Sequence, residues 1–168
     1  MIDETVVKLL ADGLIVGIIL LGGWALVFKV PKGHRYEAYT RILMAGLTAF
    51  LVAKLLGQVY QPAELRPFEL LGVEAGASFL ANPGFPSDHV LLASAITFAV
   101  LFETRLKIVT GILVVFTVLM ALGRVMALVH TPLDVIGGAI VAAVGALWYF
   151  QALRTKKADS TSPLRFRQ

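Results

Sequence analysis

Five long apolar stretches constrain the fold of this chain more than any other feature of its sequence. A helix rises about 1.5 Å per residue and needs roughly 20 apolar residues to cross a bilayer. The third stretch is the shortest, so we expect its start to lie below the membrane surface. The sequence therefore predicts an all-α integral membrane protein, a bundle of five transmembrane helices. The stretches run from about Thr5 to Phe28, Ala38 to Tyr60, Ser87 to Phe102, Leu106 to Leu122 and Pro132 to Leu153.

Composition supports a membrane protein and narrows its chemistry. Hydrophobic residues make up 58% of the 168 positions and the mean hydropathy is +0.81, which is too apolar for a soluble domain. Because the chain has no cysteine, a disulfide, a thiolate metal site and a cysteine nucleophile are all excluded. We expect one transmembrane domain over residues 1–153 and a basic cytoplasmic tail over residues 154–168.

Basic residues are unevenly distributed between the two sides of the predicted bundle. With the tail in the cytoplasm, eleven of the 15 Lys and Arg residues fall on the inner side. This bias predicts that the amino terminus lies outside and the carboxyl terminus in the cytoplasm. It also explains the net charge of +4 as an orientation signal, so we expect no nucleic-acid partner. The four basic residues on the outer side are Lys8, Lys54, Arg66 and Arg124.

The segment from Arg124 to Asp134 places charged residues between two apolar stretches, where charge is unfavourable. Thr131 has the character of a helix N-cap, with Pro132 and Asp134 at the first and third helical positions. His130 then lies just before a helix, with a carboxylate one turn further on that can orient its ring. An imidazole held in this way beside an arginine suits attack on a phosphorus centre. A helix cap beside an interfacial His and Arg explains the segment equally well.

The segment from Pro86 to His89 adds a second histidine on the same predicted side. Turn residues from Asn82 to Pro86 precede it, and an apolar stretch follows directly. Ser87 therefore lies at or near a helix N-terminus, where free N–H groups and the helix dipole favour an anion. The alternative is that Ser87 and Asp88 are only capping residues and that His89 is an interfacial ring.

Apart from Lys8 in the first stretch, the predicted outer side holds three basic side chains and two histidines. Ionisable residues within or beside a span cost roughly 2.5–3.5 kcal/mol each at the helix centre, so they usually mark a site. A strongly anionic group, and phosphate best of all, fits such a set. Its members are Lys54, Arg66, Arg124, His89 and His130.

These segments resemble the type 2 phosphatidic acid phosphatase (PAP2) superfamily. Its three motifs read Lys-(six residues)-Arg-Pro, Pro-Ser-Gly-His and Ser-Arg-(five residues)-His-(three residues)-Asp. Arg124, His130 and Asp134 match the third motif at the family's spacing. Three of the four positions of Pro86–His89 match the second motif, and Arg66-Pro67 matches the first. Three motifs in order are far more specific than any one of them.

The chain departs from the family pattern at three motif positions within the region that carries the resemblance, residues 54–138. Val59 stands where the family has the lysine of the first motif, and the nearest lysine is Lys54. Gly123 stands where the family has the serine of the third motif. Asp88 replaces the glycine of the second motif, which is similar to the bacitracin-resistance-type undecaprenyl-diphosphatases. Members of the superfamily commonly have six spans, one more than we count here.

The resemblance implies a mechanism in which His130 is the nucleophile and Asp134 orients its ring. His89 is then the acid that protonates the leaving oxygen and the base that activates water. No metal or other cofactor is implied, because cationic side chains hold the transferred phosphate. The implied phosphate-binding residues are Arg66, Ser87, Arg124 and Lys54.

A lipid is the expected substrate, since a site at the membrane face receives a headgroup while the chain stays in the hydrocarbon. The resemblance implies cleavage of a polyprenyl (undecaprenyl) diphosphate at the extracytoplasmic face of a bacterial cell membrane. Phosphatidic acid or phosphatidylglycerophosphate remains an alternative substrate. A non-catalytic lipid-phosphate binder or a transporter remains an alternative of another class. Partners other than membrane lipids are not indicated, and the oligomeric state is not predicted.

Overall fold

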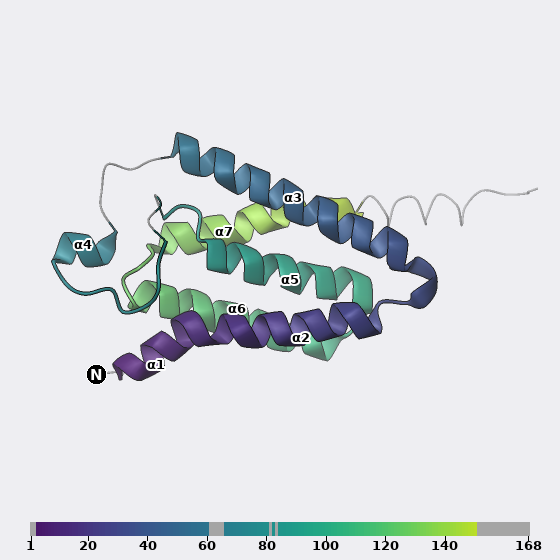
Figure 1. The fold of residues 1–168 in the computed structure, drawn as a ribbon, viewed down its shortest axis with the longest axis horizontal. Coiled ribbons are helices and arrows are strands. Elements are labelled where there is room, and N and C mark those ends of the chain that lie inside the picture. Colours follow the sequence, from purple (N-terminus) through teal and green to yellow (C-terminus); the bar gives the residue numbers. More distant parts are fainter. Residues whose placement is uncertain (1–2, 61–65, 81, 83, 151–168) are drawn as a thin grey trace, which may run out of the picture.

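The computed structural model of the chain describes residues 3–60, 66–80, 82 and 84–150, and every regular element among them is a helix. The predicted all-α class is therefore confirmed for this part of the chain. The predicted tail over residues 154–168 lies outside the described residues. In chain order the elements are α1 (Glu4–Lys8), η1 (Leu9–Gly13), α2 (Leu14–Lys29), η2 (Lys32–His34), α3 (Arg35–Val59), α4 (Pro67–Leu71), α5 (Asp88–Thr104), α6 (Lys107–Met126) and α7 (Pro132–Gly145) (Figure 1).

Four helical segments of the described chain are long and apolar enough to cross a bilayer, so the protein is a multi-pass membrane protein. The predicted fifth span is not confirmed, because α5 has only 17 residues. It begins after Ser87, whose N–H donates to the Asp134 carbonyl, and it ends where Arg105 adopts a φ of 60°. The four segments are Glu4–Lys29, Lys32–Val59, Lys107–Met126 and Pro132–Phe150.

The short helix α5 forms the centre of the bundle. It lies between α3 and α7 on one side and α2 and α6 on the other, and it packs against all four (Figure 1). Nine of its 17 residues are buried, and several of them belong to the largest hydrophobic cluster of the described chain. Small residues let the helices approach closely, as in other membrane bundles. For example, α3 turns Ala38, Ala45, Ala49 and Ala53 inward, and Gly145 of α7 contacts Ala45.

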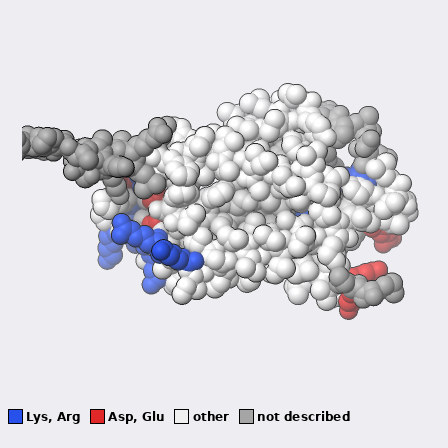
Figure 2. All heavy atoms as spheres, turned by 180° about the vertical axis from the view of Figure 1, so that it is seen from behind, with Lys and Arg blue, Asp and Glu red and all other residues white. Residues whose placement is uncertain are grey.

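The two ends of the bundle differ in charge. Basic side chains gather at the end that holds the α2–α3 and α5–α6 connections, and acidic side chains stand out at the opposite end, with some also visible at the basic end (Figure 2). The amino terminus, α4 and the α6–α7 connection share that opposite end (Figure 1). The side of the membrane that each end faces stays a prediction. The basic residues of the first end include Lys29, Lys32, Arg35, Arg105 and Lys107.

Candidate active site

The start of α7 positions the segment that carries His130. The Thr131 hydroxyl accepts a hydrogen bond from the Asp134 N–H at 3.2 Å, and Asp134 Oδ2 accepts one from the Thr131 N–H at 2.7 Å. These two bonds form a capping box with Pro132 in the first turn, as the sequence predicted. The carboxylate of Asp134 is therefore fixed at the helix mouth and faces the residue just before it.

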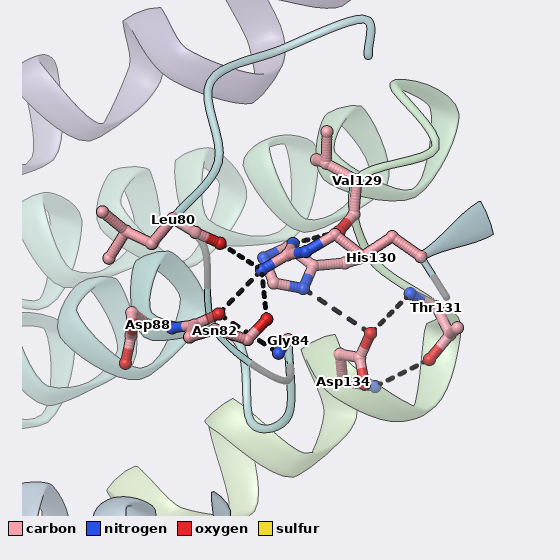
Figure 3. Close-up of polar contacts among 9 residues, drawn as sticks. Leu80, Asn82, Gly84, Asp88, Val129, His130, Thr131 and Asp134 are labelled. Atoms are coloured by element: carbon pink, nitrogen blue, oxygen red, sulfur yellow. Dashed lines mark hydrogen bonds and ion pairs between the residues drawn. The ribbon is translucent and has the colours of Figure 1, made fainter. Parts of the chain in front are cut away.

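His130 is 5% exposed, and its Nδ1 atom lies 3.5 Å from Asp134 Oδ2 (Figure 3). This distance is within ion-pair range, but it is longer than an ordinary hydrogen bond and Nδ1 has no hydrogen-bond partner among the described residues. Burial lowers the pKa of His130 below its ordinary value, Asp134 opposes this shift, and the charges of Arg124 and Arg66 add to it. The ring is therefore neutral near pH 7.

Ser87 is brought to the start of α7 by close packing between α5 and α7. Its N–H donates to the Asp134 carbonyl at 3.0 Å, and its side chain is fully buried. A Cβ atom on Gly138 would lie 2.7 Å from the Ser87 carbonyl oxygen, and one on Gly137 would clash with the Phe85 ring. The glycine pair thus allows the backbone of α7 to reach the amino-terminal end of α5.

His89 lies in the first turn of α5 and is half-buried. Burial lowers the pKa of His89, the Arg124 charge lowers it further, and Asp12 raises it. His130 and Asp88 also act on its charge, which places both imidazoles in one electrostatic neighbourhood at the same end of the bundle. The negative charge of a bound phosphate acts in the same direction as Asp12 and favours the protonated ring.

Arg66 connects the loop before α5 to the segment that carries His130. Its Nη1 donates to the Val129 carbonyl at 2.6 Å, and its Nη2 donates to the Leu80 carbonyl at 2.9 Å and to Asn82 Oδ1 at 2.7 Å (Figure 3). These acceptors are neutral, so they orient the guanidinium without cancelling its charge. Arg66 therefore adds a fixed positive charge beside the histidine.

Arg124, in the last turn of α6, is 1% exposed. Its Nη1 donates to Asp12 Oδ1 of η1 at 2.8 Å, whereas its Nε has no hydrogen-bond partner among the described residues. The Asp12 carboxylate also accepts from Ser78, through the N–H and through the hydroxyl, both at 2.9 Å. The guanidinium is thus held at one nitrogen and open at another.

We call Arg66, Ser87, His89, Arg124, His130 and Asp134 the polar cluster. Three buried polar atoms in the described residues lack a hydrogen-bond partner, and all three belong to it: Ser87 Oγ, Arg124 Nε and His130 Nδ1. An unsatisfied buried polar group costs about 1–3 kcal/mol, so three at one place need an explanation. A ligand with several acceptor oxygens satisfies the hydroxyl and the guanidinium N–H together.

Lys54 is placed differently from the rest of the predicted site. It lies on the exposed face of α3, and its Nζ is 5.3 Å from the centre of the Phe50 ring. Val59, at the family's lysine position, is 85% exposed. No group of three or more His, Asp or Glu side chains in the described part of the chain is placed to hold a metal ion.

Sequence reasoning missed two residues that contact the polar cluster. Asp12 is a single acidic residue inside the first apolar stretch, 112 positions before Arg124, and no motif marks it. Its only signal was a carboxylate within a predicted span, which usually has a partner. Asn82 was treated as a turn residue, although its side chain accepts from Arg66 and from the Gly84 N–H.

Comparison with known proteins identifies a family and several relatives that match most of the chain. The profile of the PAP2 superfamily matches residues 38–158. Over 134 residues, 80% of this chain and 65% of the relative, the chain is 31% identical to Undecaprenyl-diphosphatase BcrC of Bacillus subtilis (strain 168). Over 148 residues, 81% of this chain and 66% of the relative, it is 29% identical to Undecaprenyl-diphosphatase of Sulfolobus acidocaldarius.

A third relative has a different printed activity. The chain is 37% identical to Sphingosine-1-phosphate phosphatase 2 of Mus musculus over 92 residues, which are 51% of this chain and 26% of that protein. The chain spans no more than two thirds of the length of any of these three relatives. No solved structure matches it.

Proposed function

Because the chain belongs to the PAP2 superfamily, we propose that it is a metal-independent membrane lipid phosphatase. It cleaves the terminal phosphate of a polyprenyl diphosphate, such as undecaprenyl diphosphate, through a phosphohistidine intermediate. The polar cluster is its active site. The observation that carries this proposal is a set of buried polar atoms, on Ser87, Arg124 and His130, that have no hydrogen-bond partner among the described residues.

In the proposed first step, His130 attacks the terminal phosphorus. Its Nδ1 faces Asp134, so that the carboxylate stabilises the Nδ1 proton and Nε2 carries the attacking lone pair. A bond forms between Nε2 and phosphorus while the bond from phosphorus to the bridging oxygen breaks. The lowered pKa of His130 supports this role, because the ring is neutral and nucleophilic near pH 7.

His89 manages the protons of both steps. When protonated in the substrate complex, it gives its proton to the departing oxygen of the lipid monophosphate. The neutral ring then takes a proton from water, whose oxygen attacks the phosphorus and breaks the bond to His130. Inorganic phosphate leaves, and both rings return to their starting states.

The remaining members of the polar cluster stabilise charge on the transferred phosphate. The buried Ser87 hydroxyl and the free Nε of Arg124 donate to its oxygens, together with N–H groups at the start of α5. Arg66 contributes its charge from a fixed position. These cationic donors do the work that a magnesium ion does in many phosphoryl-transfer enzymes, which supports a metal-independent reaction. The exposed Lys54 has no part in this arrangement.

Two observations support a lipid diphosphate as the substrate. The site lies at one end of a membrane bundle, where a headgroup enters while its hydrocarbon chain stays among apolar helices. The relatives of Bacillus subtilis and Sulfolobus acidocaldarius that match about four fifths of this chain are undecaprenyl-diphosphatases. The basic residues at the opposite end support an extracytoplasmic active site in a bacterial cell membrane.

The second candidate is a phosphatase for lipid monophosphates, such as phosphatidic acid or phosphatidylglycerophosphate. The match to a sphingosine-1-phosphate phosphatase favours this candidate. A non-catalytic binder or transporter is the candidate of another class, and it needs the arginines but neither histidine. The oriented His130–Asp134 pair therefore favours chemistry over binding alone.

A phosphate-release assay separates these candidates. The purified protein is given undecaprenyl diphosphate, phosphatidate and phosphatidylglycerophosphate in detergent, with EDTA present. We expect release of one phosphate from the diphosphate, unaffected by EDTA, and slower release from the monophosphates. Loss of activity with EDTA contradicts the metal-independent mechanism. Binding of these lipids without any release supports the binder.

A further inference from the structure

Asp12 is held by three hydrogen bonds that fix both of its carboxylate oxygens. Oδ1 accepts from Arg124 Nη1 at 2.8 Å and from the Ser78 hydroxyl at 2.9 Å, while Oδ2 accepts from the Ser78 N–H at 2.9 Å. The residue lies in η1, a π-helical turn between α1 and α2. Such turns change the direction in which side chains leave a helix and are frequent at functional sites. Here the turn presents a carboxylate to the end of α6.

The contact depends on a glycine at the position before Arg124. A Cβ atom on Gly123 would lie 2.7 Å from the Ala11 nitrogen and 2.8 Å from the Leu10 carbonyl carbon. Real Cβ atoms essentially never come that close to backbone, so any larger residue moves η1 away. The missing side chain at position 123 and the carboxylate at position 12 are therefore two parts of one packing arrangement.

Asp12 forms a hydrogen bond with only one of the three nitrogens of the Arg124 guanidinium. Asp12 contacts a terminal nitrogen, and the buried Nε has no partner within the described part of the chain. A purely structural ion pair has no reason to leave a donor unsatisfied, because a forked pair through Nε and Nη2 is the stronger geometry. The pairing that exists anchors the guanidinium at Nη1 and keeps the buried Nε as a donor for another acceptor.

We propose that Asp12 is a positioning residue of the phosphatase reaction: it holds Arg124 through Nη1 so that Nε faces the transferred phosphate. This inference rests on the proposed function of the polar cluster. Asp12 does not touch the substrate, since its oxygens are occupied by Arg124 and Ser78. A carboxylate beside the guanidinium also limits the positive charge that acts on His89. The charged groups that act on His89 are Arg124, Asp12, His130 and Asp88.

The test compares Asp12→Asn with the wild-type protein and with Asp3→Asn, using undecaprenyl diphosphate as substrate across a pH series. Asp3 is a matched control, because it is an exposed carboxylate at the start of the same helical rod that caps the Thr5 N–H. We expect Asp12→Asn to lower kcat/KM by about ten- to a hundredfold, mainly through kcat, as for other small misplacements of a catalytic group. Asp3→Asn stays within about twofold.

The pH profile separates positioning from simple support of the fold. Removing the Asp12 charge leaves the charge of Arg124 with less opposition, which lowers the pKa of His89 further and makes the ring harder to protonate. The basic limb of the kcat profile therefore moves to lower pH in Asp12→Asn. A loss of folded protein lowers the amplitude of the profile but does not move its limbs. The proposal is overturned if Asp12→Asn has the same kcat/KM as the wild-type protein and the same basic limb in its pH profile. It is also overturned if the activity falls only in proportion to the fraction of folded protein.

Ser78→Ala provides a second test that does not disturb the interior. Ser78 is exposed, and the change removes only its hydroxyl bond to Asp12. We expect a fall of about threefold in kcat/KM at unchanged KM, with a small loss of thermal stability from the lost hydrogen bond. If Asp12→Asn does not fold, an unchanged kcat/KM in Ser78→Ala overturns the proposal. A wild-type protein that releases no phosphate overturns the proposed function itself, whereas an active wild type with insensitive variants overturns only the role of Asp12.

Discussion

Two arginines inside this bundle, Arg124 and Arg41, meet carboxylates in different ways. At the end with basic connections, Arg41 closes its fork on Glu103, with Nε to Oε1 at 2.7 Å and Nη2 to Oε2 at 2.8 Å. At the other end, Arg124 donates from one nitrogen to Asp12, and none of the described residues pairs with its Nε. A closed fork satisfies both partners and stabilises α3 against α5. A buried guanidinium N–H without an acceptor is unfavourable for stability, but it can donate to a bound ligand that provides one.

An arginine paired with a carboxylate inside the bundle does not by itself identify a functional site. Arg124 is buried and Arg41 is half-buried, each beside a carboxylate, and both contacts join positions far apart in the sequence. Only the surroundings of Arg124 also contain an unpartnered serine hydroxyl and a histidine oriented by a second carboxylate. Unsatisfied donors that converge are therefore the better sign of function, in line with the tension between stability and activity.

The largest expected effect comes from removing the nucleophile. We predict that His130→Ala lowers kcat by at least roughly a thousandfold, because no other group forms the covalent intermediate. Thermal stability stays equal or rises, since a buried unsatisfied atom is removed. Steady-state phosphate release measures the loss of kcat, and a thermal-unfolding scan of the same preparation measures the stability. Substantial residual turnover contradicts the role of His130.

A pair of matched substitutions tests the comparison of the two arginines directly. Arg124→Lys should lower kcat/KM by about a hundredfold with little change in stability, because lysine cannot reproduce the planar fork. Arg41→Lys should do the reverse, lowering stability by roughly 1–3 kcal/mol while kcat/KM stays within about threefold. The measurements are kcat/KM from steady-state phosphate release and the free energy of unfolding from denaturation, for both variants. If the two variants lose the same activity and the same stability, the proposed difference between a functional Arg124 and a structural Arg41 is wrong.

A smaller effect is expected in the pH dependence. Since the pKa of His130 lies below its ordinary value, the ring stays neutral to lower pH than a free histidine. The acid limb of kcat/KM should therefore have a pKa below about 6.5. In Asp134→Asn the opposing carboxylate is gone, so the limb should move to still lower pH while the rate falls. A limb at or above the ordinary value contradicts the buried neutral ring.

The smallest effect is predicted for Lys54. Its ammonium group lies over the Phe50 ring on the exposed face of α3, and no described contact ties it to the polar cluster. We expect Lys54→Ala to change kcat/KM by no more than about twofold. A loss as large as that of Arg124→Lys in the same assay shows instead that Lys54 binds the phosphate.

The sequence predicted those parts of the molecule that depend on local chemistry. The capping residues Thr131, Pro132 and Asp134 define the start of α7, and Ser87 lies at the start of α5, because cap geometry is set within a few residues. The short helix α4 was missed, since five residues between proline and glycine give little periodic signal. Its C-cap is Gly72 in the left-handed conformation.

Features that depend on distant contacts were beyond sequence reasoning. The pairs Asp12–Arg124 and Arg41–Glu103 join positions 112 and 62 residues apart, and only the packing of whole helices brings them together. The bounds of α5, in contrast, agree with the predicted third stretch, Ser87 to Phe102, which is also the shortest predicted stretch. The place of α5 at the centre of the bundle was not predicted, because hydropathy does not indicate which helices pack against one another.

The central claim is that the polar cluster transfers phosphate through His130. The most direct measurement is a rapid acid-free quench of the protein with undecaprenyl diphosphate labelled in its terminal phosphate, followed by peptide mapping of the labelled residue. Our account predicts a phosphohistidine at His130 that is absent in His130→Ala and accumulates in His89→Ala, where its hydrolysis is slowed. Phosphate release with no labelled protein, or a label on a different residue, contradicts the account.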